Sequence, residues 1–286
     1  MPLPLTVSEF RELEAELAQL HYGDIPIGRT LSDQLVIDFF WGHGDWRKRT
    51  KWLNQARRVR HRLFPRRTAA EAVASEFRDR VLITWQLSTP RINDMLLPII
   101  QELGGTRCGV IMGRKTAVPG LPSSVPVIDG GRGPSYRVTD WRSRYAADRP
   151  VWARHVKDLC LRYNLPSGAF EVLMLGLLGA SQRIERYLQF LREHRPSAVL
   201  TEYDRNHLWS CLILAARHLK IPTATLVHGV IPPTGVGFAP TLADLVICWG
   251  ELDKAKLLSA GDPPDKIVIG GCPRLTRNLP TSVVAR

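Results

Sequence analysis

Short apolar runs alternate with amphipathic helical patterns along most of the chain after residue 80. Runs of this length are typical of strands that are buried on both faces of a sheet. Strands that alternate with helices predict right-handed crossovers and a mainly parallel sheet, so the predicted fold class is α/β, doubly wound and Rossmann-like. The predicted strands are 80–85, 107–112, 125–129, 197–203, 223–228, 243–249 and 266–270. The predicted helices are 90–103, with a kink at Pro98, and 150–163, 167–194, 206–219 and 251–260.

The first 75 residues lack this alternation and are predicted to form an N-terminal helical extension. Its first helix lies in the segment TVSEFRELEAELAQL, where Ser8 is the candidate N-cap residue. The patterns therefore divide the chain into the extension (1–75), a Rossmann-like domain (76–272) and a short terminal segment (273–286).

Charge is concentrated in one part of the extension. The chain has 39 Lys and Arg residues against 27 Asp and Glu residues, a net charge of +12, and ten of the basic residues lie in 46–70, which has no acidic residue. In a helix, an apolar stripe that includes Trp52 would leave a basic face, and such a helix suits an anionic membrane surface. The candidate membrane-binding residues are Trp52, Arg57, Arg58, Arg60 and Arg62. The alternative is a helix that packs on the main domain by the same stripe and leaves its basic face in water.

The lengths of the apolar runs, the amino terminus and the cysteines indicate where in the cell the protein is expected to lie. No apolar run reaches the roughly 18 residues that a spanning helix needs, and the amino terminus lacks a basic and then apolar secretion signal. The five cysteines are odd in number and widely spaced, which favours reduced thiols over disulfides or a zinc site. We therefore expect a cytoplasmic protein, with peripheral contact at the inner face of the membrane as the role of the basic segment. Charge alone supports nucleic-acid binding, because no DNA- or RNA-binding module accompanies it.

Polar residues follow two of the predicted strands. In a doubly wound sheet, ligands bind beyond the carboxyl ends of the strands. Glu202, Asp204 and Arg205 end one strand, and His228 and Gly229 end the next. A histidine at a strand mouth can accept a proton, and the following glycine permits close approach of a ligand. The alternatives are that Asp204 or Asn206 caps the following helix, or that a lone histidine is structural.

Phosphate-binding motifs are weak in this sequence. The segment GVIMGRKT (109–116) superficially matches a Walker A loop, but Arg114 stands where the second glycine must be, which excludes that loop. The glycine-rich loop 130–135 could present backbone amides and Arg132 to a phosphate, although most such loops are only turns. Glu202 and Asp204 have the spacing of a metal-binding carboxylate pair, but one pair is insufficient and no metal is assigned.

The segment 228–274 carries a more specific signal. It contains the pair His228-Gly229, a Pro/Gly-rich loop, the passage from Ala243-Asp244 to Gly250-Glu251, and the phrase GDPPDKIVIGGCPR. In this order it resembles the end of the first domain of GT-B-fold glycosyltransferases. The relatives that it resembles are surface-carbohydrate and capsule-polysaccharide transferases, together with CDP-glycerol glycerophosphotransferases and UDP-N-acetylglucosamine 2-epimerase. The resemblance is specific over about 50 residues and plausible back to residue 80.

The resemblance implies an enzyme that transfers a sugar from a nucleotide-activated donor to an acceptor hydroxyl in surface polysaccharide or glycolipid synthesis. It makes 76–272 the acceptor-side domain and 273–286 a hinge or the start of a donor domain. His228 would be the general base or a donor-phosphate contact, with Glu202 and Asp204 as further catalytic candidates. Gly229, Arg205, Arg274 and Arg132 would bind substrate. The nucleotide sugar is a co-substrate, so no bound cofactor is expected.

The same resemblance implies a donor domain of roughly 100–200 further residues, whereas the sequence stops 12 residues after Arg274. The donor half would then be supplied by a longer chain or by a partner chain. The alternative hypothesis is a non-catalytic accessory protein that binds a carbohydrate or glycolipid, or the membrane, beside such a transferase.

Overall fold

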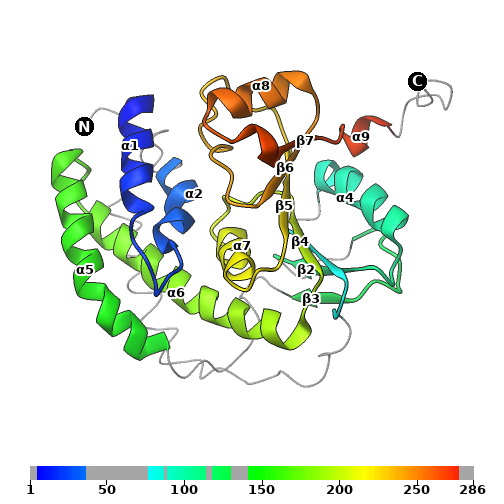
Figure 1. The fold of residues 1–286 in the computed structure, drawn as a ribbon, viewed down its shortest axis with the longest axis horizontal. Coiled ribbons are helices and arrows are strands. Elements are labelled where there is room, and N and C mark those ends of the chain that lie inside the picture. The colour runs from blue at the N-terminus through cyan, green and yellow to red at the C-terminus, as the bar shows by residue number, and fades with distance from the viewer. Residues whose placement is uncertain (1–4, 37–76, 87–88, 114–117, 130–140, 277–286) are drawn as a thin grey trace.

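The computed structural model describes residues 5–36, 77–86, 89–113, 118–129 and 141–276. They form an α/β fold around a seven-stranded sheet in which every neighbouring pair of strands is parallel, and this confirms the predicted Rossmann-like class (Figure 1). All predicted strands are present, and each is shorter than predicted by one to three residues. Their bounds are β1 Val81–Trp85, β2 Cys108–Met112, β3 Val127–Asp129, β4 Ala198–Thr201, β5 Thr223–Leu226, β6 Leu245–Cys248 and β7 Ile267–Ile269.

The strand order is β3-β2-β1-β4-β5-β6-β7. Ile83 at the middle of β1 aligns with Val110 on β2 and with Leu200 on β4, so β1 lies between strands that are far apart in sequence. The order reverses between β1 and β4, because the chain first adds strands on one side of β1 and then continues on the other. In such sheets this switch point opens a crevice at the carboxyl ends of the two strands.

Helices cover the sheet on both faces. Their bounds are α4 Pro90–Leu103, α5 Trp141–Arg162, α6 Ala169–His194, α7 Trp209–His218, α8 Glu251–Ser259 and α9 Pro273–Thr276, with a 3-10 turn at Pro264–Lys266. Side chains of α4 pack on one face, where Ile83 and Trp85 are fully buried, while α6 and α7 pack on the other, where Leu82 and Val199 are. Eight residues of α7 are buried, from Trp209 to Ala216, as expected of a helix enclosed on all sides.

The start of one helix, α5, differs most from the predictions. α5 begins at Trp141, nine residues before the predicted start at 150. Its first turns lack an apolar stripe, but Tyr145 packs its ring against both Trp141 and Trp152, at 6.2 and 5.7 Å between centroids. Aromatic contacts along the helix therefore replace the periodic pattern that the prediction required. α4 runs through Pro98 to Leu103, the predicted end.

The N-terminal segment is helical, as predicted, with α1 Val7–Leu17, a 3-10 helix η1 at Ile27–Leu31 and the short α2 Ser32–Leu35. The N-cap of α1 is Thr6 and not Ser8. Thr6 and Glu9 bond reciprocally to each other's backbone amides in a capping box, a pairing that the prediction overlooked. The predicted basic helix within 46–70 lies outside the described residues.

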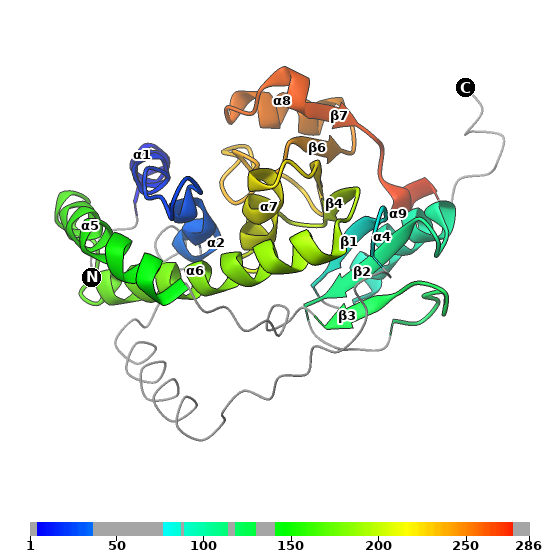
Figure 2. The ribbon, with the colours of Figure 1, turned by 60° about the horizontal axis from the view of Figure 1, so that its bottom comes forward.

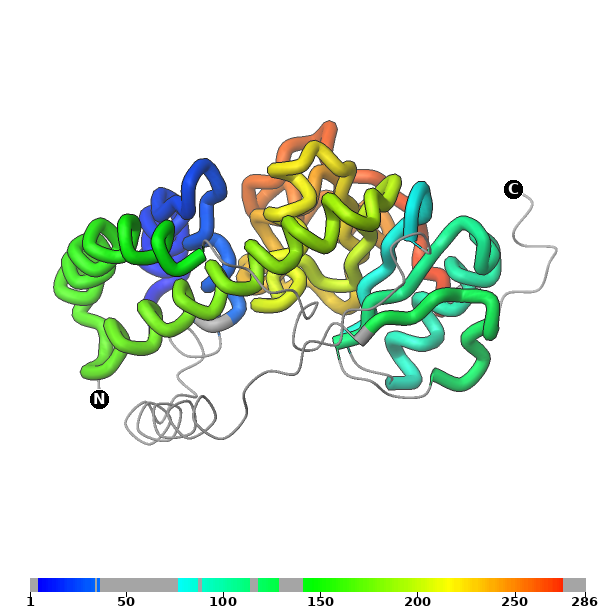
Figure 3. The backbone as a smooth tube through the Cα atoms, turned by 90° about the horizontal axis from the view of Figure 1, so that it is seen from below, coloured from blue at the N-terminus to red at the C-terminus, as the bar shows by residue number. Residues whose placement is uncertain are grey.

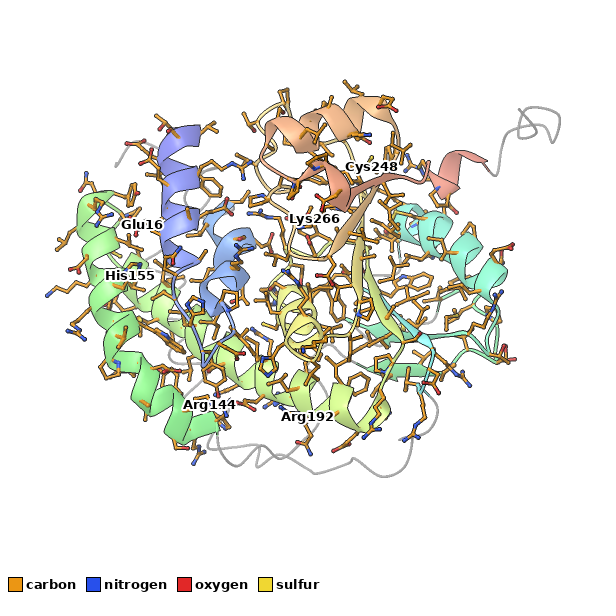
Figure 4. The ribbon with its side chains drawn as sticks, in the orientation of Figure 1. Glu16, Arg144, His155, Arg192, Cys248 and Lys266 are labelled. Carbon is orange, nitrogen blue, oxygen red and sulfur yellow. The ribbon has the colours of Figure 1, made fainter. Side chains whose placement is uncertain are left out.

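The N-terminal helices pack on α5 and α6. Phe10, Leu13 and Leu17 of α1 are fully buried in the same core cluster as Trp152 and Val156 of α5. Figures 2 and 3 show α6 running the width of the molecule, from beneath these helices to the sheet. Polar contacts also join α1 and α5. Glu16 of α1 pairs with Arg162 of α5 at 2.6 Å, and the backbone oxygen of Glu16 is 3.1 Å from Nε2 of His155 (Figure 4). No helix in the described ranges is long and apolar enough to span a membrane.

Candidate functional site at the carboxyl edge of the sheet

Glu202 is the first residue after β4, at the switch point of the sheet. Its side chain is 2% exposed and accepts hydrogen bonds from Thr84 Oγ1, from the Gln86 amide at 2.5 Å and from Trp209 Nε1 at 3.2 Å. These donors come from the end of β1 and from α7, so the carboxylate ties three elements together. Burial raises the pKa of Glu202 to about 7, although the hydrogen bonds from Thr84, Gln86 and Trp209 act in the opposite direction.

Asp204 is also enclosed, but its carboxylate serves the backbone. It accepts the amides of Leu242, at 2.5 Å, and Ala243, at 2.9 Å. Burial raises its pKa, against these two hydrogen bonds. The capping role considered for Asp204 is wrong, because Asn206 Oδ1 accepts the Leu208 amide at 2.9 Å ahead of α7. Asp204 instead fixes the loop that precedes β6.

Arg205 is 1% exposed, which is unusual for a guanidinium. Nη2 forms an ion pair with Glu14 of α1, and Nη1 donates to the backbone oxygen of Pro240 at 2.8 Å. Arg205 was predicted to bind substrate. In the structure its donors connect the N-terminal helix with the loop before β6.

His228 lies two residues beyond the end of β5, the strand that pairs with β4. Its ring stacks on Phe238 with centroids 5.2 Å apart and planes 20° apart, and it lies 4.8 Å from the Tyr203 ring. The side chain is half-buried, and its Nδ1 atom is fully buried without a hydrogen-bond partner among the described residues. Burial, and to a smaller extent the positive charge of Arg91, lower the pKa of His228 to about 4, and a hydrogen bond to the Glu202 backbone opposes both effects. The ring is therefore neutral at pH 7.

Arg91 completes the edge of the sheet and was not singled out from the sequence. It lies in the first turn of α4, after the Thr89 N-cap, and its Nε donates to the backbone oxygen of His228 at 2.8 Å, with Nη2 on the same oxygen. A Cβ at Gly229 would collide with this guanidinium, so the glycine allows the contact. The sequence offered one indication of its role, which is its position: Arg91 lies at the start of the helix that follows β1, the strand at the switch point.

The space beside His228 is small. A cavity of about 10 Å³ is lined by Tyr203, Asp204, Thr225, His228 and Phe238, among others, and has room for about one water molecule. A larger cavity of about 600 Å³ lies by the C-terminus of α7, toward the amino ends of β5 and β6. Its main charged side chains are already paired, Arg217 with Asp244 at 2.8 Å and His218 with Asp24 at 3.1 Å. In the ranges that the structure describes, no group of three or more His, Cys, Asp or Glu side chains could hold a metal ion.

The remaining predicted site residues are placed elsewhere or not described. Arg274 lies on α9, half-buried, and α9 packs against α4. Arg132 and the predicted membrane-binding residues Trp52, Arg57, Arg58, Arg60 and Arg62 lie outside the described residues.

Comparisons with known proteins give limited information. No family model matches the chain, and no curated protein matches it. Among solved structures, UDP-N-acetylglucosamine 2-epimerase from Rickettsia bellii is similar at 15% sequence identity and a TM-score of 0.38, over 72% of this chain and 49% of that one. The chain thus spans about half the length of this neighbour, and a similarity this low carries no argument about function.

Proposed function

We propose that the chain binds a nucleotide-activated sugar at the carboxyl edge of its sheet and takes part in transferring the sugar to an acceptor hydroxyl of a surface polysaccharide or glycolipid. The observation that carries the proposal is the pairing of His228 and Arg91. A half-buried neutral imidazole, whose buried Nδ1 has no hydrogen-bond partner among the described residues, lies beside an exposed guanidinium at the mouth of a parallel sheet. The resemblance of segment 228–274 to GT-B-fold transferases supports the same assignment.

Arg91 and the start of α4 have the chemistry to attract a diphosphate. Nε and Nη2 of Arg91 bind the His228 carbonyl, which leaves Nη1 without a partner among the described residues. Pro90 has no amide hydrogen, and the amides of Ile92 and Asn93 are already bonded to Thr89, so the helix dipole rather than a set of free amides would favour an anion here. A guanidinium at that position would hold phosphate oxygens through charge-assisted hydrogen bonds.

His228 would act on the acceptor. In transfer, the acceptor oxygen forms a bond to the sugar C1, the bond from C1 to the phosphate oxygen breaks, and the nucleoside diphosphate leaves with that electron pair. The acceptor hydroxyl must lose its proton, and Nδ1 of neutral His228 is the base that would take it. Nδ1 is buried in the free protein, so this step requires the His228 or Phe238 ring to move first. A pKa near 4 makes the ring a weak base, but the negative charge of a bound diphosphate raises it toward the range that suits catalysis.

A second candidate is a non-catalytic module that binds carbohydrate or glycolipid for a partner transferase. The cavity beside His228, about 10 Å³, is too small for a nucleotide sugar, which argues against catalysis by this edge alone; the carbohydrate of an accessory module would have to bind elsewhere on the chain. Under the first candidate, the missing wall of the site is contributed by chain beyond the described residues or by another protein.

Calorimetric titration of the full chain distinguishes the two candidates. The ligands are UDP-, GDP-, CDP- and dTDP-linked sugars, the free nucleoside diphosphates and the uncharged sugars. The proposal predicts that one nucleotide class binds, that Arg91→Ala weakens this binding about tenfold or more, and that His228→Asn reduces sugar transfer more than binding. Arg107→Ala is the matched control, because Arg107 bonds only to carbonyls at the far end of α4.

Each outcome has one meaning. Binding of uncharged sugars or glycolipids that is insensitive to Arg91→Ala, with no binding of any nucleotide, would favour the accessory module and reject the first candidate. Nucleotide binding that is equally weakened by Arg107→Ala and Arg91→Ala would place the ligand away from His228.

A further inference from the structure

Four consecutive backbone carbonyls, those of residues 239–242, each accept a hydrogen bond from a different cationic side chain. This stretch, the 239–242 segment, lies between the loop that follows His228 and the start of β6. The donors are Arg11 to Ala239, Arg205 to Pro240 at 2.8 Å, Lys266 to Thr241 at 2.5 Å and Arg217 to Leu242 at 2.9 Å (Lys266 is labelled in Figure 4). Hydrogen bonds with an ionised partner are about twice as strong as neutral ones.

Carboxylates hold the amides of the same stretch. Asp262 accepts the Thr241 amide at 2.9 Å, and Asp204 accepts the amides of Leu242 and Ala243. Asp204 and Asp262 are both nearly fully buried. The backbone here is therefore fixed by charged groups on both its donor and its acceptor sides, and this constrains the residues immediately before it.

Two of these contacts depend on the N-terminal helix. Arg11 lies on α1 and also donates to the backbone oxygen of Thr234 at 3.0 Å, so it holds the loop at two points more than 220 residues away in sequence. Glu14, one turn later on α1, pairs with the buried Arg205 and with Arg11, at 3.4 Å in the second pair. The helix thus contributes one direct clamp and the counter-charge for another.

The clamped loop carries the ring that covers His228. Phe238 immediately precedes the 239–242 segment and stacks on the imidazole, and Tyr203 Oη donates to the Gly237 backbone oxygen at 2.8 Å. Displacement of Ala239 would move Phe238, because the two residues share a peptide bond.

We propose that α1 is part of the candidate site: Arg11 and Glu14 are positioning residues that hold the 234–240 loop so that Phe238 stacks on His228. The proposal rests on the proposed function for its biological meaning, but the positioning itself is a property of the free protein. It assigns a role to an N-terminal segment that the resemblance to transferases does not include.

Histidine NMR tests the positioning directly. The His228 resonance is identified by its loss in His228→Asn. Stacking on Phe238 should shift it upfield in the wild type, and Phe238→Leu gives the reference for a lost stack. Arg11→Ala should move the resonance toward that reference and raise the pKa of His228 by about one unit toward 6.5, because the ring becomes more hydrated. The groups that face the ring, Arg91 on α4 and Glu202, Tyr203 and Asp204 after β4, are unchanged in this variant.

Arg162→Ala is the matched control, since it removes an exposed arginine contact to α1 without touching the loop. His194, buried against Phe77 and Phe190, reports an intact fold in every variant. If Arg11→Ala fails to fold, Arg11→Gln gives the same comparison.

A folded Arg11 variant with the wild-type shift and pKa of His228 would overturn the proposal, even if its melting temperature falls, because Arg11 would then contribute to stability alone. The proposed function fails separately, if no nucleotide binds the wild type while Arg11→Ala still moves the His228 signal.

Discussion

The ends of β4 and β5 are neighbours in the sheet, yet their side chains are used differently. After β4, the side chains of Glu202, Asp204 and Arg205 are nearly fully buried and bonded to other parts of the protein. After β5, His228 is half-buried, its buried Nδ1 has no hydrogen-bond partner among the described residues, and Arg91 beside it is exposed. The position of a residue at a strand end therefore does not by itself show whether its side chain belongs to a functional site or only holds the fold together. The contacts that each polar side chain makes distinguish the two cases.

The largest expected effect is on stability, at the β4 end. Arg205→Met should lower the free energy of unfolding by about 3–5 kcal/mol, because it removes the ion-pair partner of Glu14 while the Glu14 carboxylate stays largely buried. Arg162→Met, which breaks an exposed pair on the same helix, should cost under about 1 kcal/mol. Urea unfolding measures both. Similar small losses in the two variants would contradict the structural role of the β4 end.

The second effect is a pH dependence from Glu202. Its pKa is about 7 in the folded protein against an ordinary 4.5, so the folded state binds the proton more tightly. Stability from this group is present below pH 4.5 and is lost as the pH rises to about 7, a total of about 3 kcal/mol. Glu202→Gln should remove this loss. An unchanged slope between pH 4.5 and 7 in that variant would argue against an enclosed, titrating Glu202.

His228 should act with the opposite sign. Its pKa is lowered to about 4, so its contribution to stability is present above pH 6.5 and is lost as the pH falls toward 4. In the wild type the contributions of Glu202 and His228 oppose each other between pH 4.5 and 6.5. His228→Asn should make the fall in stability with rising pH steeper, and Glu202→Gln should reverse it. Thermal melts across this range check the sign, and changes in the same direction in both variants would refute the contrast.

The smallest effect on stability is expected for Arg91→Ala. Arg91 is exposed, so its removal should change the free energy of unfolding by under about 1 kcal/mol. It should nevertheless raise the pKa of His228, because the nearby positive charge helps to keep the ring neutral. NMR titration of His228 provides the measurement, with Arg107→Ala as the control. A fall in the pKa would show that the guanidinium does not act on the imidazole as the structure indicates.

Local patterns predicted most of the fold. Apolar runs such as 107–112 became strands because a parallel sheet buries both faces of each strand, and the period of 90–103 gave the whole of α4. The early turns of α5 were missed because aromatic contacts at Tyr145, rather than an apolar stripe, hold them.

The candidate site was predicted only in outline. Sequence position placed His228 and Glu202 at adjacent strand ends, since β4 and β5 are consecutive. It could not show that Arg205 faces Glu14, or that Arg91 reaches His228 from 137 residues away, because such pairs depend on the three-dimensional arrangement of distant segments.

The most direct test of the contrast between the two strand ends is the pKa of His228, measured by NMR with and without a saturating nucleoside diphosphate. An anion held by Arg91 beside the ring should raise that pKa from about 4 by about one unit or more, while Glu202, enclosed behind it, keeps its own titration nearly unchanged. A bound diphosphate that leaves the pKa of His228 unchanged would contradict the assignment of the β5 end as the functional site.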